Sequence, residues 1–127
     1  MDGNIDVEIV APIACTESEE KVIRSVSKIF PGVDLRREGE AIAGVASTLS
    51  VLDRLRMQVR ARRIRASARA IILKGVKSGS LTFYIDKQAA YMGRVSFWDP
   101  SERHMPSPIM VRVRTENPMD VVEWLTR

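Results

Sequence analysis

The chain has 127 residues, of which 45% are hydrophobic and 28% are charged. This length predicts a single domain over residues 1–127, and the hydrophobic fraction excludes an intrinsically disordered chain. No run of about 20 apolar residues is present, so we expect no membrane-spanning helix. The single cysteine, Cys15, cannot form an internal disulfide, and together with the single histidine, His104, it is too little for a zinc site. These counts favour a cytoplasmic protein.

The net charge of +4 is unevenly distributed along the chain. Residues 54–77 contain nine basic side chains and no acidic one, whereas the rest of the chain contains eleven basic and sixteen acidic side chains. A mildly acidic body with one concentrated basic segment is typical of proteins that bind phosphate-rich partners. Arginine outnumbers lysine by 15 to 5, and Asn and Gln together number four, which indicates a thermophilic source.

The first two elements follow from alternation and from a helix-start signal. Residues 5–13 begin with alternating apolar and polar side chains, which predicts a half-buried strand. Thr16 and Glu19 have the spacing of a capping box, in which each side chain satisfies a free backbone N–H group of the other residue. We therefore expect a helix that begins after Thr16 and ends at Pro31.

The middle of the chain is typical of a hairpin followed by helices. Residues 33–38 and 41–47 predict two short strands, and Gly44 in the second one marks a bulge or a close approach of the backbone. The spacing of apolar residues then predicts a helix over residues 50–63 and a further helical stretch over residues 64–76. Periodicity alone leaves open whether these form one bent helix or two.

The second half returns to strands and closes with a helix. Residues 81–86 and 109–114 alternate, residues 94–97 predict another strand, and three prolines mark residues 99–108 as a loop. Asn117 can cap a C-terminal helix. Neighbouring strands with helices grouped apart predict an α+β fold of two layers, in which a largely antiparallel sheet is backed by helices.

No motif of a catalytic site is present in the sequence. His104 lies in the proline-rich loop without a neighbouring carboxylate to orient its ring, and a solvent-exposed loop histidine is the simpler interpretation. Cys15 lies where the first strand meets the first helix, and we expect it to be buried rather than a nucleophile. Because a Gly-rich phosphate loop, paired catalytic acids and an Asp-rich metal motif are all lacking, we expect no catalytic residue, metal or cofactor. An enzyme acting on a phosphorylated small molecule is the least favoured alternative.

The basic segment is the strongest functional signal. Arg56, Arg60 and Arg63 are spaced by four and three residues on the predicted helix, and we call these three residues the arginine stripe. Arg65 and Arg69 continue the stripe if the two helical stretches are nearly collinear. A guanidinium matches two phosphate oxygens and stays charged at any working pH. The stripe therefore suits the phosphate backbone of a nucleic acid.

Three further residues complete the predicted nucleic-acid site. Lys74 and Lys77 close the basic segment. Tyr84 alternates away from the buried face of its strand, where its ring can stack on an unpaired base. Packing on the surface of the sheet is the simpler role for such an aromatic ring.

Two other interpretations of the basic segment stay open. It can be a solvated face that pairs with acidic groups such as Glu17, Glu19 and Glu20, in a structural protein that assembles as a homodimer. It can also lie on an anionic membrane surface, but the apolar positions of its helices lack Trp and Phe and are needed for the core. We rank RNA binding first because no acidic residue interrupts the segment.

Two short segments resemble the sequence pattern of a known family. Residues 86–90, Asp-Lys-Gln-Ala-Ala, and residues 93–97, Gly-Arg-Val-Ser-Phe, are similar to the Asn-Lys-Gln-Ala-Ala and Gly-Lys/Arg-x-Asn-Phe motifs of a small, uncharacterised archaeal family described as RNA-binding. The Arg-rich middle and the ending at residues 121–125 agree with this family, so the resemblance covers nearly the whole chain. Asp86 and Ser96 stand where the family usually has Asn.

The resemblance implies a fold and a partner. Members of the family look like the large-subunit ribosomal protein that binds 5S rRNA, in a two-layer α+β fold, and distant relatives are predicted accessories of the RNA exosome. The resemblance thus implies RNA as the partner and a role in an RNA-processing complex. It offers no catalytic or ligand residue to carry over, so the basic residues remain the predicted site of a non-catalytic RNA-binding protein.

Overall fold

The computed structural model describes residues 5–99, 101 and 107–127. Within these ranges the chain forms one sheet of seven strands, five α-helices and a short 3₁₀-helix, η1. The strands are β1 (Asp6–Pro12), β2 (Arg36–Glu38), β3 (Ala41–Ala46), β4 (Val76–Lys77), β5 (Ser80–Ile85), β6 (Phe97–Trp98) and β7 (Ile109–Arg114). The helices are α1 (Glu19–Ile29), η1 (Leu49–Leu52), α2 (Asp53–Ala61), α3 (Arg65–Leu73), α4 (Lys87–Tyr91) and α5 (Pro118–Leu125).

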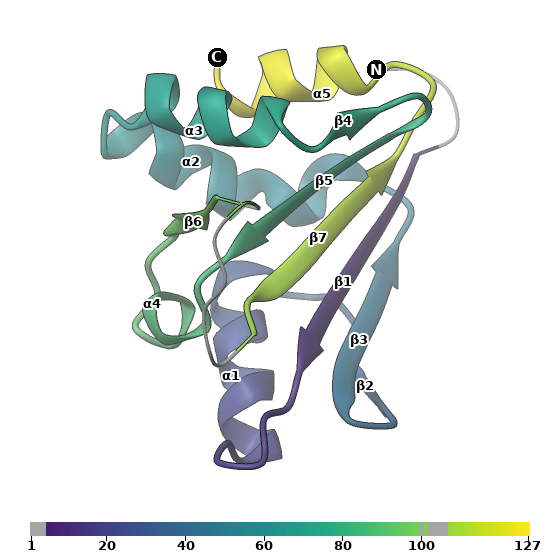
Figure 1. Cartoon of the computed structure of the whole chain (residues 1–127), viewed down its shortest axis with the longest axis vertical. Helices are drawn as coiled ribbons and strands as arrows, with labels where there is room; N and C mark the ends of the chain where they lie inside the picture. Colours follow the sequence, from purple (N-terminus) through teal and green to yellow (C-terminus); the bar gives the residue numbers. More distant parts are fainter. Residues whose placement is uncertain (1–4, 100, 102–106) are drawn as a thin grey trace.

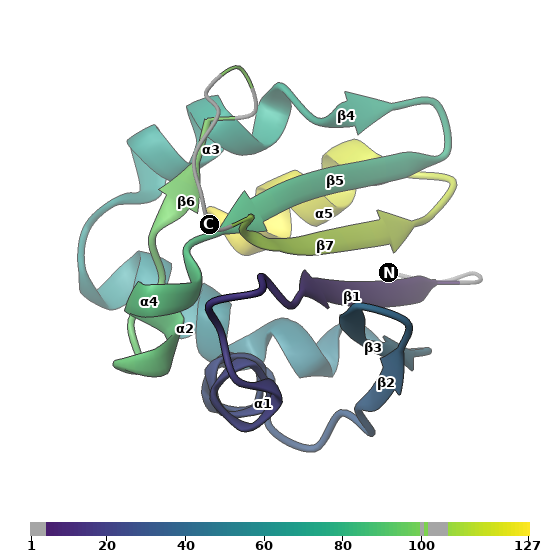
Figure 2. The same ribbon diagram turned by 60° about the horizontal axis from the view of Figure 1, so that its bottom comes forward.

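The sheet places the first and the last of the described strands side by side. The strand order is β2-β3-β1-β7-β5-β4, and β6 pairs with the end of β5 (Figure 1). All pairings among the described strands are antiparallel. β1 and β7 therefore lie side by side at the centre, as Figure 2 shows from a second direction. This architecture confirms the predicted α+β fold.

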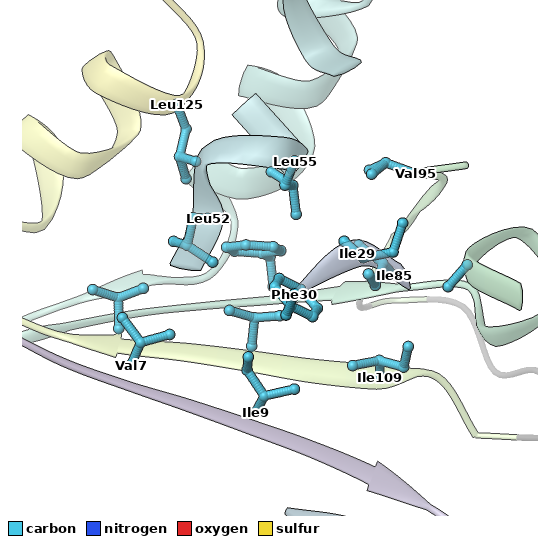
Figure 3. Close-up of a cluster of buried hydrophobic side chains, with 14 of the residues drawn as sticks. Val7, Ile9, Ile29, Phe30, Leu52, Leu55, Ile85, Val95, Ile109 and Leu125 are labelled. Atoms are coloured by element: carbon cyan, nitrogen blue, oxygen red, sulfur yellow. The ribbon is translucent and has the colours of Figure 1, made fainter. Parts of the chain in front are cut away.

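One face of the sheet packs against the helices. In β1 the side chains of Val7 and Ile9 are buried, whereas the alternating Glu8 and Val10 are only half-buried on the opposite face. The side chains above the buried face come from α1 and its C-terminal cap, η1, α2 and α5, and include Ile29, Phe30, Leu52, Leu55 and Leu125 (Figure 3). Each such fully buried side chain contributes about 1.5–3 kcal/mol relative to an exposed one. The helices thus form the second layer of the fold.

Helix α1 does not begin with the predicted capping box. Its N-cap is Ser18, whose Oγ accepts a 3.2 Å hydrogen bond from a backbone N–H of the first turn. Thr16 lies outside the helix, and the helix begins at Glu19. The Glu17 carboxylate accepts a 2.9 Å hydrogen bond from Ala14 N, which holds the residues before α1 in a turn. The prediction that Thr16 is the N-cap is therefore wrong.

Gly44 marks a close approach of the backbone and not a bulge. The register of β3 with β1 runs without interruption past this residue. A Cβ atom at Gly44 would lie 2.6 Å from Val33 Cγ1 and 2.9 Å from Leu35 Cδ2. Only glycine therefore lets the segment before β2 pack against β3.

The basic segment forms two separate helices. α2 ends at Ala61, two residues earlier than predicted, because Arg63 adopts a left-handed backbone with φ of 55°. α3 begins at Arg65 and ends at Leu73. The end of the predicted helical stretch is wrong, since Val76 begins the short strand β4.

Candidate nucleic-acid interface

The nine basic side chains of residues 54–77 divide into two groups. Five of them have a partner within the protein: Arg54, Arg56, Arg62, Arg69 and Lys74. Four have no hydrogen-bond or ion-pair partner within the described part of the chain: Arg60, Arg63, Arg65 and Lys77. The sequence predicted that this segment forms one nucleic-acid site, whereas the contacts separate cations that bind other parts of the protein from exposed cations without such a partner in the described residues.

Arg56 and Arg69 attach the C-terminal helix α5 to α2 and α3. Arg56 Nε donates a 2.8 Å hydrogen bond to Trp124 O, and its guanidinium carbon lies 4.9 Å from the centre of the Trp124 ring, a cation–π contact. Arg69 Nη2 lies 2.6 Å from Glu123 Oε1. Both guanidinium groups are half-buried and already engaged, so their first role is to hold α5 in place.

Three side chains on one side of α2 hold neighbouring segments. Gln58 donates to Gly93 O at 2.7 Å and accepts from Val95 N at 2.8 Å. Arg62 donates to Val95 O, and Arg54 donates a 2.7 Å hydrogen bond to the last turn of α1. These contacts fix the Gly-Arg-Val-Ser-Phe segment against α2, so this motif has a structural role.

Three arginines without partners gather where α2 meets α3. Arg60 lies in the last turn of α2, Arg63 is the left-handed residue between the helices, and Arg65 is the first residue of α3. All three are exposed, and we call them the basic turn. In Figure 1 the connection that contains them lies at one end of the helical layer. The left-handed backbone at Arg63 means that the residues form a cluster at this turn and not the predicted helical line.

The start of α3 is electrostatically open to an anion. Its N-cap, Ile64, offers no side-chain hydrogen bond, and its first turn contains no acidic residue. The free N–H groups and the positive end of the helix dipole therefore lie next to the cationic side chain of Arg65. The positive end of the helix and the Arg65 side chain together favour a bound anion such as a phosphate.

Lys74 is engaged at the other end of α3. Its Nζ lies 2.5 Å from Asp99 Oδ2, directly after β6. The hydrogen bond from Lys74, with two further ones from the N–H and hydroxyl of Ser101, lowers the pKa of Asp99 to about 2. This pair joins the edge of the sheet at β6 to the helical layer.

The last two predicted residues lie on the sheet. Lys77 pairs with Ser80 at the edge of the sheet, and Tyr84 is half-buried on the face opposite the helices. The predicted site residues thus lie on two surfaces: the helical layer, with Arg56, Arg60, Arg63, Arg65, Arg69 and Lys74, and the sheet, with Lys77 and Tyr84.

The acidic residues proposed as partners of the arginines pair elsewhere. Glu20 pairs with Arg24 on α1 itself at 2.8 Å. Glu19 lies 3.9 Å from Arg37 of β2. The prediction that Glu19 and Glu20 pair with the basic segment is therefore wrong.

Sequence reasoning missed a buried cation in the Asp-Lys-Gln-Ala-Ala segment. Lys87 is 4% exposed and donates to Pro12 O and, at 2.7 Å, to Glu17 Oε1. Asp86 caps α4 by accepting a 2.7 Å hydrogen bond from Ala89 N. The signal available in the sequence was the resemblance of this segment to the family motif. A lysine is buried only where it has a specific partner, and here that partner is distant in the sequence.

The cysteine and the histidine considered in the sequence are placed differently from the predicted site or lie outside the described residues. Cys15 is exposed, so its predicted burial is wrong, and His104 lies outside the described residues. No group of three or more His, Cys, Asp or Glu side chains in the described ranges could hold a metal ion, and no helix there is long and apolar enough to cross a membrane. A hollow of about 530 Å³ lies between α1 and α4, next to the ion pair of Lys87.

Comparisons with known proteins identify the family of the chain and support its fold. A family model described as "RNA binding" matches residues 6–115. A UPF0201 protein of Methanothermobacter thermautotrophicus is 35% identical over 94% of this chain and 89% of its own length. A UPF0201 protein of known structure is 35% identical, with a TM-score of 0.80 over 95% of this chain and 92% of that one. A second structure, from Methanococcus jannaschii, is 27% identical, with a TM-score of 0.79 over 95% of this chain and 92% of that one.

The matched family defines the class as archaeal α+β proteins described as RNA-binding. The chain belongs to this RNA-binding family, as one of the UPF0201 proteins.

Proposed function

We propose that the protein is a non-catalytic RNA-binding protein and that its basic turn contacts backbone phosphates. The observation behind this proposal is that Arg60, Arg63 and Arg65 are exposed, lie within six residues of one another, and have no partner within the described part of the chain. A protein gains no stability from unpaired cations that repel one another, so an external anion is their natural partner.

Contacts of this kind read the backbone and not the bases. Three guanidinium groups and the free N–H groups at the start of α3 bind phosphate oxygens whatever the sequence. We therefore propose that binding through this surface is tolerant of RNA sequence and sensitive to salt. On the resemblance of the sequence to the family, we also propose a place in an RNA-processing complex and kinship with the ribosomal protein that binds 5S rRNA.

The test is equilibrium binding of a single-stranded RNA at about 50 mM salt, where phosphate contacts are strong. The variant Arg60→Ala/Arg63→Ala/Arg65→Ala should bind much more weakly, and to a similar degree for unrelated sequences. The matched control is Arg24→Ala, an exposed arginine on α1 whose loss should leave binding unchanged. The corresponding triple Lys variant should recover part of the affinity, because charge is kept while the planar fork is lost.

Absence of RNA binding by the unaltered protein would contradict the proposal. If the protein then proved to be a homodimer by light scattering, a structural assembly without nucleic acid would be favoured. Stabilisation by a nucleotide or sugar phosphate in a thermal melt would instead favour a site for a small phosphorylated ligand.

A further inference from the structure

Five adjacent strands each place one residue in a row across the open face of the sheet. The cross-strand partners run in the order Ala43, Val10, Met110, Tyr84 and Trp98. We call these five residues the open-face row. Neighbouring strands lie about 4.8 Å apart, so that the row extends for about 19 Å.

The row is apolar on a side of the sheet where polar residues are usual. Its side chains are half-buried, whereas the residues that alternate with them on the same strands, such as Phe83, face the core. One step further along β3, Val45 is 66% exposed. At the β6 end, Trp98 donates a 3.1 Å hydrogen bond from Nε1 to Asp86, which fixes the position of the indole. The partly exposed apolar side chains of the row offer a surface on which a flat ligand can lie.

Charged residues lie beside the row on the same face, three of them basic (Arg112, Arg114 and Lys77) and two acidic (Glu8 and Asp6, the cross-strand partners of Arg112 and Arg114). Along β7, Arg112 and Arg114 follow Met110 at steps of two residues, or about 7 Å each. Lys77 of β4 lies in the same cross-strand row as Arg114. Arg112 lies 3.6 Å from Glu8, whereas Arg114 and Lys77 are exposed and have no partner in the described ranges.

We infer that the open-face row is a platform on which the unpaired bases of single-stranded RNA stack, with Arg114 and Lys77 beside the phosphates. The inference rests on the proposed function, because it names the kind of RNA that is bound. Aromatic rings that share a face of the sheet with cations further along the strands fit single strands, in which every base has a π-face and every nucleotide a negative charge. Bases in a duplex are stacked on one another and cannot reach this surface.

The extent of the family match supports this choice of occupant. Residues 6–115 begin at β1 and end just after β7, so they include every strand of the row as well as the basic turn, and leave out α5. A second copy of the chain would cover the apolar row, but it would leave the free cations Arg114 and Lys77 without a role.

Photocrosslinking locates the bases directly. The full chain is irradiated with a single-stranded oligouridylate of about 12 nucleotides that contains 5-iodouridine, a length within the range that single-strand-binding domains cover. We expect crosslinked peptides from β5, β6 or β7, at Tyr84, Trp98 or Met110. Crosslinks confined to residues 60–65 would overturn the platform while leaving the proposed function intact. Failure of any RNA to bind would overturn both.

Two substitutions at one position give an independent measurement. Tyr84→Leu removes the aromatic face and keeps apolar bulk, and it should weaken binding of the oligouridylate about tenfold while leaving binding of an RNA duplex unchanged. Tyr84→Phe keeps the ring and should bind as the unaltered protein does. If Tyr84→Leu binds both RNAs normally, the platform is wrong. If it instead changes the molar mass measured by light scattering, the row is an interface between copies of the chain.

Discussion

The ammonium nitrogen of Lys87 lies 2.7 Å from Glu17 Oε1, although the two residues are 70 positions apart. Glu17 belongs to the connection between β1 and α1, and Lys87 is the first residue of α4. Their side chains are 18% and 4% exposed, so the pair is largely withdrawn from water. The ion pair therefore fastens α4 to the β1–α1 connection.

Breaking this pair should destabilise the fold. Lys87→Met removes the cation and leaves the Glu17 carboxylate partly buried without its counter-charge, which should lower the free energy of unfolding by about 3–5 kcal/mol. Urea denaturation measures the change. Lys21→Met is the matched control on α1, because Lys21 is exposed and its ammonium has no ion-pair partner in the described residues, and it should change stability by about 0.5 kcal/mol at most. Equal effects of the two variants would show that the buried pair has no special role.

Substitutions at Arg56 and at Arg60 should affect different properties, the first the stability of the fold and the second the affinity for RNA. Arg56→Ala removes the hydrogen bond to Trp124 and the cation–π contact with its ring, so it should lower the free energy of unfolding by about 1–2 kcal/mol. Arg60→Ala, one turn further along α2, should leave stability unchanged and weaken RNA binding. Thermal melts and binding titrations of the two variants check this. If Arg56→Ala instead weakened RNA binding and Arg60→Ala lowered stability, the phosphate contacts would lie on the side of α2 that faces α5.

Asp99 should make stability sensitive to acid. Its pKa in the folded protein is about 2, below the ordinary value of 3.8. The folded state therefore binds fewer protons than the unfolded state, and the stabilisation is complete above about pH 4 and is lost as the pH falls toward 2. The effect should be small because the Lys74–Asp99 pair is partly exposed. Asp99→Asn should flatten the pH dependence of the melting temperature in this window, and an unchanged slope would show that the pair contributes nothing.

Gly75 should not tolerate a side chain. A Cβ atom there would lie 1.7 Å from Thr82 O, and Thr82 N donates a 3.0 Å hydrogen bond to Gly75 O. Because the obstacle is backbone, Gly75→Ala should cost about 3 kcal/mol or more, measured by urea denaturation. Gly79→Asn is the control: Gly79 has φ of +80° and open space around its Cα, and Asn adopts such a backbone more readily than other residues do. A cost at Gly79 equal to that at Gly75 would contradict this explanation.

The pattern of neighbouring residues in the sequence predicted the strands that show a regular alternation of buried and exposed side chains. The alternation of β1, β5 and β7 placed the correct residues on the buried face, because a half-buried strand requires that period. Asn117 was placed correctly at the N-cap position of α5, but its side chain makes no capping hydrogen bond there. The capping box failed because Ser18 offers an equally good side chain two residues after Thr16, and Glu17 is needed by Lys87.

The candidate site was less predictable from the sequence. Whether a basic side chain has a partner within the protein depends on residues that are distant in the sequence. Arg56 looked like a member of a free stripe, but its partner Trp124 is 68 residues away. Arg63 looked helical, but its left-handed backbone ends α2. Spacing along a helix shows which cations are neighbours, whereas only the packing of α5 shows which of them are already occupied.

The salt dependence of RNA binding tests the central claim most directly. Each phosphate contact with a single strand contributes about −0.7 to the slope of log K against log salt concentration. Losing the three arginines of the basic turn should therefore make the slope shallower by about 2, with melting temperatures unchanged. A triple variant that keeps the slope of the unaltered protein, or one that melts far earlier and binds RNA as before, would contradict the assignment of Arg60, Arg63 and Arg65 to the phosphate backbone.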